Sequence, residues 1–120
     1  MIKIHETNLG AVMIDENALA KMAGNIATKC YGVVGMVYRS RRDGLVSLLK
    51  RDKMGKGIQV RMGEEGLNIS LHIMVEYGVN IGVISESIIK NIKYQMEQST
   101  GLKIQDVTVH VETVRAQGVK

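Results

Sequence analysis

Two histidines and two glutamates fall at positions that would bring them onto one face of a β-sheet. Two separate segments alternate apolar and polar residues; the first places His72 and Glu76 on one side of a strand, and the second does the same for His110 and Glu112. If these strands are neighbours, the four side chains converge, and imidazole and carboxylate groups are ligands that zinc accepts. The simpler interpretation is that each is a polar residue on the solvent-facing side of a sheet. We therefore predict no metal site and no cofactor.

Other stretches resemble catalytic or nucleotide-binding motifs but lack residues that those motifs require. Gly55-Lys56-Gly57 lacks the Ser or Thr that follows the lysine of a phosphate-binding loop. The GEEG stretch has the G-x-x-G spacing of an RNA-clamping loop, but its centre is two glutamates, so it is read as a hairpin turn. Cys30 is the only cysteine, which excludes an intrachain disulfide and a cysteine-based zinc site, and it continues an apolar helical stripe. We predict no catalytic residue and a protein that is not an enzyme.

The positive charge of the chain is concentrated in one segment, residues 38–57 (YRSRRDGLVSLLKRDKMGKG). This segment holds seven of the sixteen Lys and Arg residues and only two acidic residues, so its formal charge is +5, whereas the rest of the chain sums to −1. The seven residues are the candidate contact site for a partner or another anionic surface: Arg39, Arg41, Arg42, Lys50, Arg51, Lys53 and Lys56.

Four interpretations of this basic segment remain open. It could neutralise the phosphates of a nucleic acid, although nucleic acid is the less favoured partner because Tyr38 is the only aromatic residue in the segment. It could lie against an anionic membrane surface, but four apolar residues give little insertion. It could match an acidic protein surface, where charge sets encounter rate and specificity. It could also be a merely solvated face.

Periodicity in the sequence predicts the elements that must position these residues. In order, they are a strand (9–15), an amphipathic helix (16–30), a strand (31–38), a short helix (44–51), a hairpin of two strands (58–62 and 67–78), a long helix (81–100) and a last strand (102–111). The alternation of the last strand changes phase at Gln105 and Asp106, where we expect a bulge or a turn. Residues before the first strand, including His5, are expected to form an N-terminal tail.

The order β-α-β-α(short)-β-β-α-β favours an α+β two-layer sandwich, with helices packed on one face of a mostly antiparallel sheet. A length of 120 residues suits one domain, 1–120, and an apolar fraction of 45% suits an ordinary globular protein. The chain has four Tyr and no Phe or Trp, so the core must be aliphatic. No apolar run is long enough to span a membrane, so we expect a cytoplasmic protein that reaches a membrane only through a partner or a peripheral contact.

Three stretches of the chain match a known family in order and spacing: VMIDENALAKMAGNIATKCYGVVGM, KGIQVRMGEEGLNISLHIMVEYGVNI and GLKIQDVTVHVETV. Within them, Gly32-Val33-Val34-Gly35-Met36 and Val75-Glu76-Tyr77-Gly78 carry the pattern. Over residues 9–114 the chain resembles the alkaline shock protein family of bacterial envelope-stress proteins, common in Gram-positive bacteria, and most closely its small single-domain branch.

The resemblance implies a non-enzymatic role in cell-envelope stress and homeostasis, and no catalytic residues are carried over. It also implies a protein partner, either a membrane-anchoring protein or a dihydroxyacetone-kinase-like protein linked to lipid metabolism. Self-association is a further expectation, because a sheet face bearing Gln59, Arg61, Ser70, His72 and His110 could pair with a second copy.

Two functional hypotheses follow from the residues and the resemblance together. The preferred one is a cytoplasmic adaptor or scaffold protein of the envelope stress response that acts by protein–protein contacts. The alternative is a small nucleic-acid-binding α+β domain that uses residues 38–57.

Overall fold

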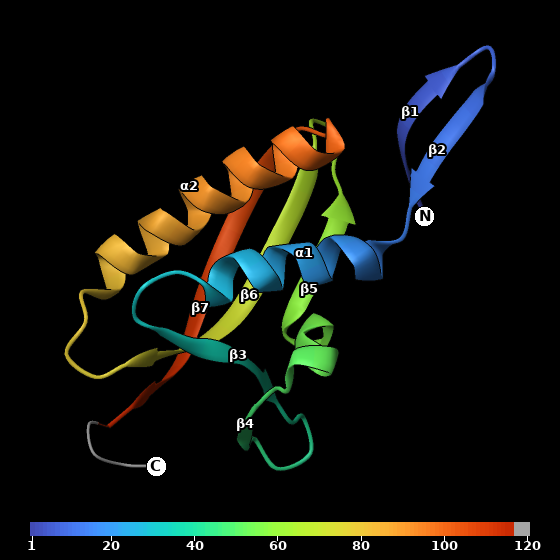
Figure 1. The fold of residues 1–120 in the computed structure, drawn as a ribbon. Coiled ribbons are helices and arrows are strands. Elements are labelled where there is room, and N and C mark those ends of the chain that lie inside the picture. Colours follow the sequence, from blue (N-terminus) through green and yellow to red (C-terminus); the bar gives the residue numbers. More distant parts are fainter. Residues whose placement is uncertain (117–120) are drawn as a thin grey trace.

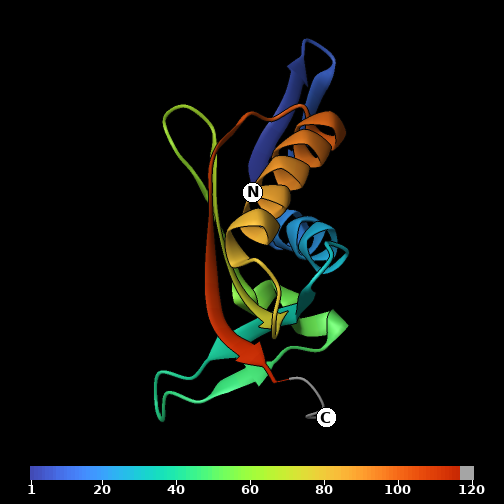
Figure 2. The same ribbon diagram turned by 90° about the vertical axis from the view of Figure 1, so that its left-hand side faces the viewer.

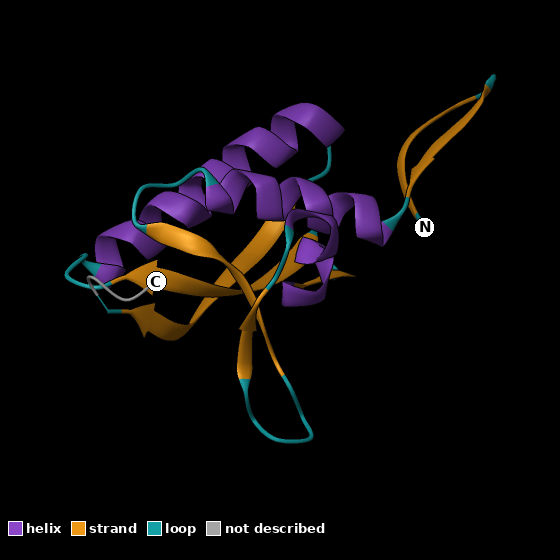
Figure 3. Cartoon of the chain, turned by 60° about the horizontal axis from the view of Figure 1, so that its bottom comes forward, coloured by secondary structure: helices purple, strands orange, loops and turns teal. Residues whose placement is uncertain are grey.

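Two helices lie on one face of a five-stranded sheet, and a separate two-stranded hairpin projects from the N-terminal end (Figure 1). The structure is a computed structural model that describes residues 1–116, apart from the side chains of residues 51, 52 and 54. The elements in chain order are β1 (Ile2–Thr7), β2 (Gly10–Ile14), α1 (Glu16–Thr28), β3 (Val33–Arg39), β4 (Val46–Leu48), the 3-10 helix η1 (Arg51–Gly57), β5 (Ile58–Met62), β6 (Leu67–Glu76), α2 (Ile81–Thr100) and β7 (Ile104–Arg115). The α+β class and the helices on one face are confirmed (Figure 3).

Strand β6 is the centre of the sheet. On one side it pairs in parallel with β7 along almost its whole length. On its other side it pairs antiparallel with β5 over Leu67–Leu71 and then with β3 from Ile73 to Val75. The sheet is therefore mixed but mostly antiparallel. The basic segment connects the end of β3 to the start of β5, the two strands that pair with this side of β6.

Apolar positions of both helices and of β6 face one another across a single core. Every second residue of β6, from Leu67 to Val75, is buried beneath the helices. From α2 the stripe of Ile84, Ile88, Ile92 and Met96 packs onto them, and small residues of α1 such as Ala23 and Ala27 allow close approach. The core formed by the described residues is aliphatic, as expected.

The helix ends follow from capping chemistry. The Asp15 side chain accepts a hydrogen bond from the backbone N–H of Asn17 at 2.9 Å, and Asn80 accepts one from Val83 at 3.1 Å. Gly101 ends α2 in the left-handed conformation, with φ 75°. The predicted limits of the long helix are confirmed, and the first helix ends at Thr28, two residues earlier than expected.

The predicted hairpin is confirmed, and of the bulge or turn expected in the last strand the structure shows a bulge. Strands β5 and β6 pair from Ile58↔Leu71 to Met62↔Leu67 around the GEEG turn. The register of β7 on β6 moves from Leu67↔Ile104 to Asn68↔Asp106, which leaves Gln105 as the extra residue.

The short helix predicted at 44–51 is wrong. Val46–Leu48 is instead a strand, β4, that pairs antiparallel with the end of β3 from Val37↔Leu48 to Arg39↔Val46. The last residues of β3 have left β6 by this point, so their free backbone groups are available to a new strand. The only helical turn nearby is η1, which begins at Arg51. The leucine spacing fitted a helix, but backbone pairing with β3 decided the conformation.

The prediction of an N-terminal tail is also wrong. Residues 2–7 form β1, which pairs with β2 from Ile2↔Ile14 to Thr7↔Gly10 and makes a hairpin apart from the main sheet (Figure 2). Ile2 is buried and anchors the base of this hairpin to the core. The predicted strand at 9–15 therefore exists as β2, but its partner is β1, and the observed order begins β-β-α.

Candidate functional site

The face of the sheet opposite the helices carries a connected row of polar side chains. The residues of β6 that alternate with the buried ones, including Ser70 and His72, point to this face and are half-buried. His72 and His110 occupy the same register position on β6 and β7. The sequence left open whether the two histidines meet, and the parallel pairing of β6 with β7 brings them together. The five residues expected on an uncovered face, Gln59, Arg61, Ser70, His72 and His110, lie on β5, β6 and β7.

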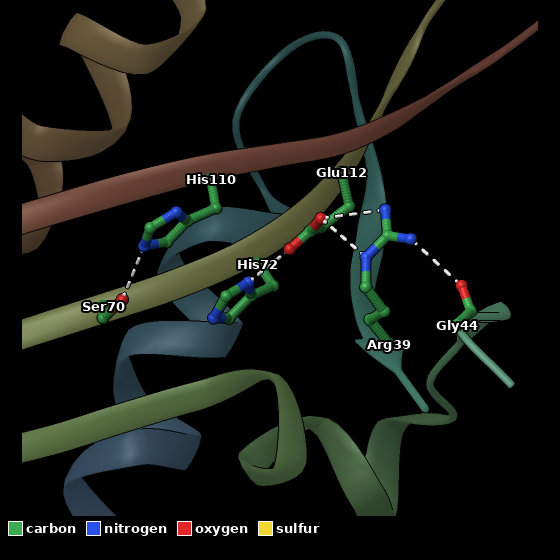
Figure 4. Close-up of polar contacts among 6 residues, drawn as sticks. All are labelled: Arg39, Gly44, Ser70, His72, His110 and Glu112. Carbon is green, nitrogen blue, oxygen red and sulfur yellow. Dashed lines mark hydrogen bonds and ion pairs between the residues drawn. The ribbon is translucent and has the colours of Figure 1, made fainter. Parts of the chain in front are cut away.

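A chain of hydrogen bonds runs from this face to the basic segment (Figure 4). His110 Nε2 lies 3.0 Å from Ser70 Oγ, and the His110 ring stacks on His72 with a centroid separation of 4.5 Å. His72 Nδ1 lies 2.7 Å from Glu112 Oε2. The other oxygen, Glu112 Oε1, accepts from Arg39 Nε at 3.2 Å and from Nη2 at 3.1 Å. Strand segments far apart in sequence are thus connected by side chains.

Arg39 extends this network into the loop that joins β3 and β4. Its Nη1 donates to the backbone oxygen of Gly44 at 3.0 Å. The loop is closed internally by hydrogen bonds from Ser40 N to Leu45 O at 2.8 Å and from Gly44 N to Ser40 O at 2.9 Å. Gly44 has φ 71°, a conformation that glycine adopts without strain. Arg39 is therefore a structural residue that holds the loop against the sheet.

A second bulge in β7 presents Glu112 to its partners. The register passes from Ile73↔Val111 to Met74↔Thr113, so Glu112 is an extra residue with no partner on β6. The pKa of Glu112 lies below its ordinary value because His72 donates a hydrogen bond to the carboxylate and Arg39 adds a second; partial burial opposes them. Glu112 is therefore held as a carboxylate at neutral pH.

The zinc interpretation does not fit this geometry. The two imidazole planes are 9° from parallel and stacked, so their ring nitrogens do not converge on one point. Glu112 is engaged by His72 and Arg39, and Glu76 pairs with Arg115 instead. Among the side chains that the structure describes, no three from His, Cys, Asp or Glu are arranged to hold a metal ion.

The structure divides six of the seven candidate residues of the basic segment into three groups. Arg39 belongs to the network already described. Arg41 and Lys56 line a pocket of about 220 Å³ beside that network. The remaining residues whose side chains are described, Arg42, Lys50 and Lys53, are exposed to solvent, and the side chain of Arg51 lies outside the described part of the chain.

Lys21 on α1 is a basic residue that the sequence reasoning missed. It lines a second pocket, of about 280 Å³, together with Asn17, Lys53, Gly55 and Lys56. More than thirty residues separate Lys21 from this part of the basic segment, and no local charge pattern connects them. Only the packing of η1 against α1 brings the cations together.

The glycines around Lys56 have a packing role. A Cβ on Gly57 would lie 2.7 Å from the backbone oxygen of Val37, closer than such contacts occur. The end of η1 therefore approaches β3 only because residue 57 is glycine. This accounts for the second glycine of the Gly-Lys-Gly stretch without a phosphate-binding loop.

Comparison with known proteins decides the family. The model of the alkaline shock protein 23 family, described as having a cell envelope-related function, matches residues 4–116. The chain belongs to this family. The resemblance inferred from the motifs is therefore confirmed, and it extends further toward the N-terminus than the motifs alone indicated.

Its relatives in the alkaline shock protein family are named only as uncharacterized proteins. The chain is 34% identical to YloU of Bacillus subtilis (strain 168) over 110 residues, which cover 91% of this chain and 92% of YloU. It is 30% identical to Spy1614 of Streptococcus pyogenes serotype M6 over 118 residues, or 98% of this chain and 97% of the relative. YqhY of Bacillus subtilis is 28% identical over 106 residues, 88% of this chain and 78% of YqhY.

No solved structure matches this alkaline shock protein family chain. None of the helices in residues 1–116 has the length and apolar character required to cross a membrane.

Proposed function

We propose that this member of the alkaline shock protein family is a non-enzymatic adaptor of cell-envelope homeostasis. It contacts an acidic surface of a partner protein through the outward-facing part of its basic segment. The observation that carries the proposal is the exposure of Arg42, Lys50 and Lys53 outside the hydrogen-bonded network that fixes Arg39. Charges that do not stabilise the fold are available to a partner, where they raise encounter rate and specificity.

The shape of the molecule supports a contact at this place. The loop between β3 and β4, residues 40–45, projects from the body on the side away from α2 (Figures 2 and 3). Leu45 at the end of this loop is 65% exposed and Leu48 is 51% exposed. Exposed apolar side chains beside cations are typical of a protein–protein contact, in which a small apolar centre is surrounded by polar groups.

The family description supports the setting of the proposal. A cell envelope-related function is compatible with a partner that is either a membrane-anchoring protein or a dihydroxyacetone-kinase-like protein of lipid metabolism. Under this proposal the protein acts in the cytoplasm and reaches the membrane through the partner.

Site-specific photo-crosslinking in cells tests this proposal. A crosslinking amino acid replaces Arg42 in one variant and Lys93 on α2 in a control variant, since both positions are basic and neither is buried. We expect the Arg42 position alone to be joined to an envelope or lipid-metabolism protein. The same experiment with Lys50→Glu and Lys53→Glu added should abolish the adduct.

Two outcomes would contradict the proposal. Adducts at position 42 that are no more specific than those at position 93 would remove the evidence for a contact site. Recovery of nucleic acid in place of protein would favour the alternative, a nucleic-acid-binding domain. A salt series on RNA and DNA would then measure how many phosphates are neutralised.

A further inference from the structure

The pocket beside the Arg39–Glu112–His72 network has the composition of an anion-binding site. Val37, which is fully buried, forms part of its lining. Tyr38 and Arg41 contribute from the β3 side, Lys56 and Gln59 from the end of η1 and the start of β5, and Arg39, His72 and Glu112 complete it. Its volume of about 220 Å³ is several times the ~30 Å³ that one water molecule occupies in the liquid. It can therefore hold a polyatomic group.

The single carboxylate in the lining is already neutralised. One oxygen of Glu112 accepts from two nitrogens of Arg39, and the other lies 2.7 Å from His72 Nδ1. Glu112 is consequently not available to Arg41 or Lys56. The network also fixes the position of the guanidinium of Arg39 along one wall of the pocket.

Arg41 and Lys56 therefore face the pocket as two cations without an acidic partner among the side chains that the structure describes. Asp43 is the nearest described acid in sequence to Arg41, but its carboxylate accepts a hydrogen bond from the backbone N–H of Leu45 at 3.0 Å. Two cations that share one cavity repel each other, and an anion placed between them removes this repulsion.

We infer that this pocket binds the phosphate group of a phosphate monoester. A phosphate monoester carries a charge near −2 at neutral pH, which Arg41 and Lys56 together neutralise, whereas a carboxylate would leave one cation unpaired. Its three terminal oxygens need more donors than a carboxylate does. Four of the residues that line the pocket carry donors of this kind: Arg41, Lys56, Gln59 and Tyr38.

The inference goes beyond the adaptor function and does not depend on it. The contact proposed above uses Arg42, Lys50 and Lys53, whereas the phosphate site uses Arg41 and Lys56. Either site can therefore be removed by substitution while the other keeps its charges. The phosphate can belong to a soluble ester or to a lipid headgroup, and the experiment separates these sources.

Titration with glycerol 3-phosphate, followed by backbone amide NMR at constant ionic strength, tests the site. We expect saturable shifts confined to residues near 37–41 and 56–59, with one ligand per chain. The variant Arg41→Gln/Lys56→Gln should weaken binding at least tenfold. The control Lys90→Gln/Lys93→Gln removes the same charge from α2 and should bind as the wild type does.

The control variant gives the experiment a clear negative outcome. Equal weakening by both double variants, or shifts that never saturate, would show general attraction of an anion to a basic protein and would overturn the inference. Amide spectra of each variant without ligand establish that it is folded. Failure here would leave the crosslinking result at position 42 unaffected.

Vesicles identify the source of the phosphate. Phosphatidylcholine vesicles with added phosphatidic acid present a phosphate monoester, and those with added phosphatidylglycerol present a diester. Binding to the first and not to the second, lost in Arg41→Gln/Lys56→Gln, would assign the site to a lipid headgroup. Binding of glycerol 3-phosphate without binding to either kind of vesicle would assign it to a soluble ester. Binding to neither ligand, or equally to both vesicles, would overturn the inference.

Discussion

His72 and His110 lie directly opposite each other on parallel strands, with ring centroids 4.5 Å apart and ring planes 9° from parallel. Each ring of the stack also has a hydrogen-bond partner. Ser70 pairs with His110, and Glu112 pairs with His72. The arrangement stiffens the polar face of the sheet. It also gives the pair a geometry that differs from that of metal ligands.

The first prediction concerns zinc. Because parallel stacked rings do not direct two nitrogens to one ion, addition of an equimolar zinc salt should change the Tm of the wild type no more than it changes the Tm of His72→Ala. Differential scanning calorimetry measures both. A Tm that rises with zinc in the wild type alone would show that the two histidines rearrange to bind the metal.

The second prediction concerns Glu112 and pH. Its folded pKa is lowered from an ordinary value of 4.5, so the unfolded chain binds the proton more readily. The stabilisation is therefore fully present above pH 4.5 and is lost as the pH falls through the lower folded pKa. We expect Glu112→Gln to lower the free energy of unfolding at pH 7 by about 1 kcal/mol.

Urea unfolding at several pH values checks this dependence. The wild type should lose stability on acidification below pH 4.5 more steeply than Glu112→Gln. Glu86→Gln is the matched control, since Glu86 forms an exposed ion pair with Lys90 on α2. If Glu86→Gln flattened the acid dependence as much as Glu112→Gln, the network would have no special role.

The third prediction concerns the loop between β3 and β4. Arg39 joins Glu112 to the backbone oxygen of Gly44, and a lysine cannot reproduce this two-sided contact. We expect Arg39→Lys to accelerate amide hydrogen exchange in residues 40–48 severalfold while leaving α2 unchanged. Arg42→Lys, a change at an exposed position in the same loop, should leave the exchange as it is. Equal acceleration by both variants would show that Arg39 does not hold the loop.

The fourth prediction concerns Gly57. Its replacement by alanine forces a Cβ to within 2.7 Å of a backbone oxygen, and backbone cannot move aside as a flexible side chain can. We expect Gly57→Ala to lower the free energy of unfolding by about 1–3 kcal/mol. In Gly82→Ala the new Cβ meets Asn80 Oδ1 at 3.5 Å, an ordinary contact within a helix, so this control should be neutral or slightly stabilising. A neutral Gly57→Ala would mean that η1 shifts without cost.

Local patterns predicted the elements that have strong local causes. The stripe from Ile84 to Met96, bounded by the Asn80 cap and Gly101, determines α2 without help from the rest of the chain. The alternation on either side of the GEEG turn determines the β5–β6 hairpin, and the phase change at Gln105 determines the bulge in β7. The family motifs lie in these same segments, which is why the resemblance was visible.

The N-terminal hairpin gave weaker signals. Its loop is Asn8-Leu9, between the paired residues Thr7 and Gly10, and lacks the Asn-Gly or Asp-Gly dipeptide that marks a two-residue turn. Ile2 and Ile4 are the only apolar residues of β1, so its alternation is short. An isolated hairpin of two strands has marginal stability in water. Burial of Ile2 in the core supplies the stability that the local sequence does not.

The conformation and grouping of the basic segment were decided by the tertiary structure alone. Leu45, Leu48 and Leu49 have helical spacing, but the free edge of β3 offers hydrogen bonds to an extended backbone, and β4 forms there. Charge counting found seven basic residues in one segment and treated them as one group. The fold fixes Arg39 on Glu112 and places Arg41 and Lys56 in the lining of the pocket beside it, whereas Arg42, Lys50 and Lys53 are exposed and do not line that pocket.

The sequence by itself determined the family, the two helices, the central hairpin and the polar face that carries the histidines. Tertiary structure decided which of these polar groups meet, because His72 and Glu112 are forty residues apart and their contact depends on the parallel pairing of β6 with β7. Periodicity records which side of a strand a residue faces. It contains no information about the neighbouring strand, since strand pairing depends on backbone groups that every sequence has.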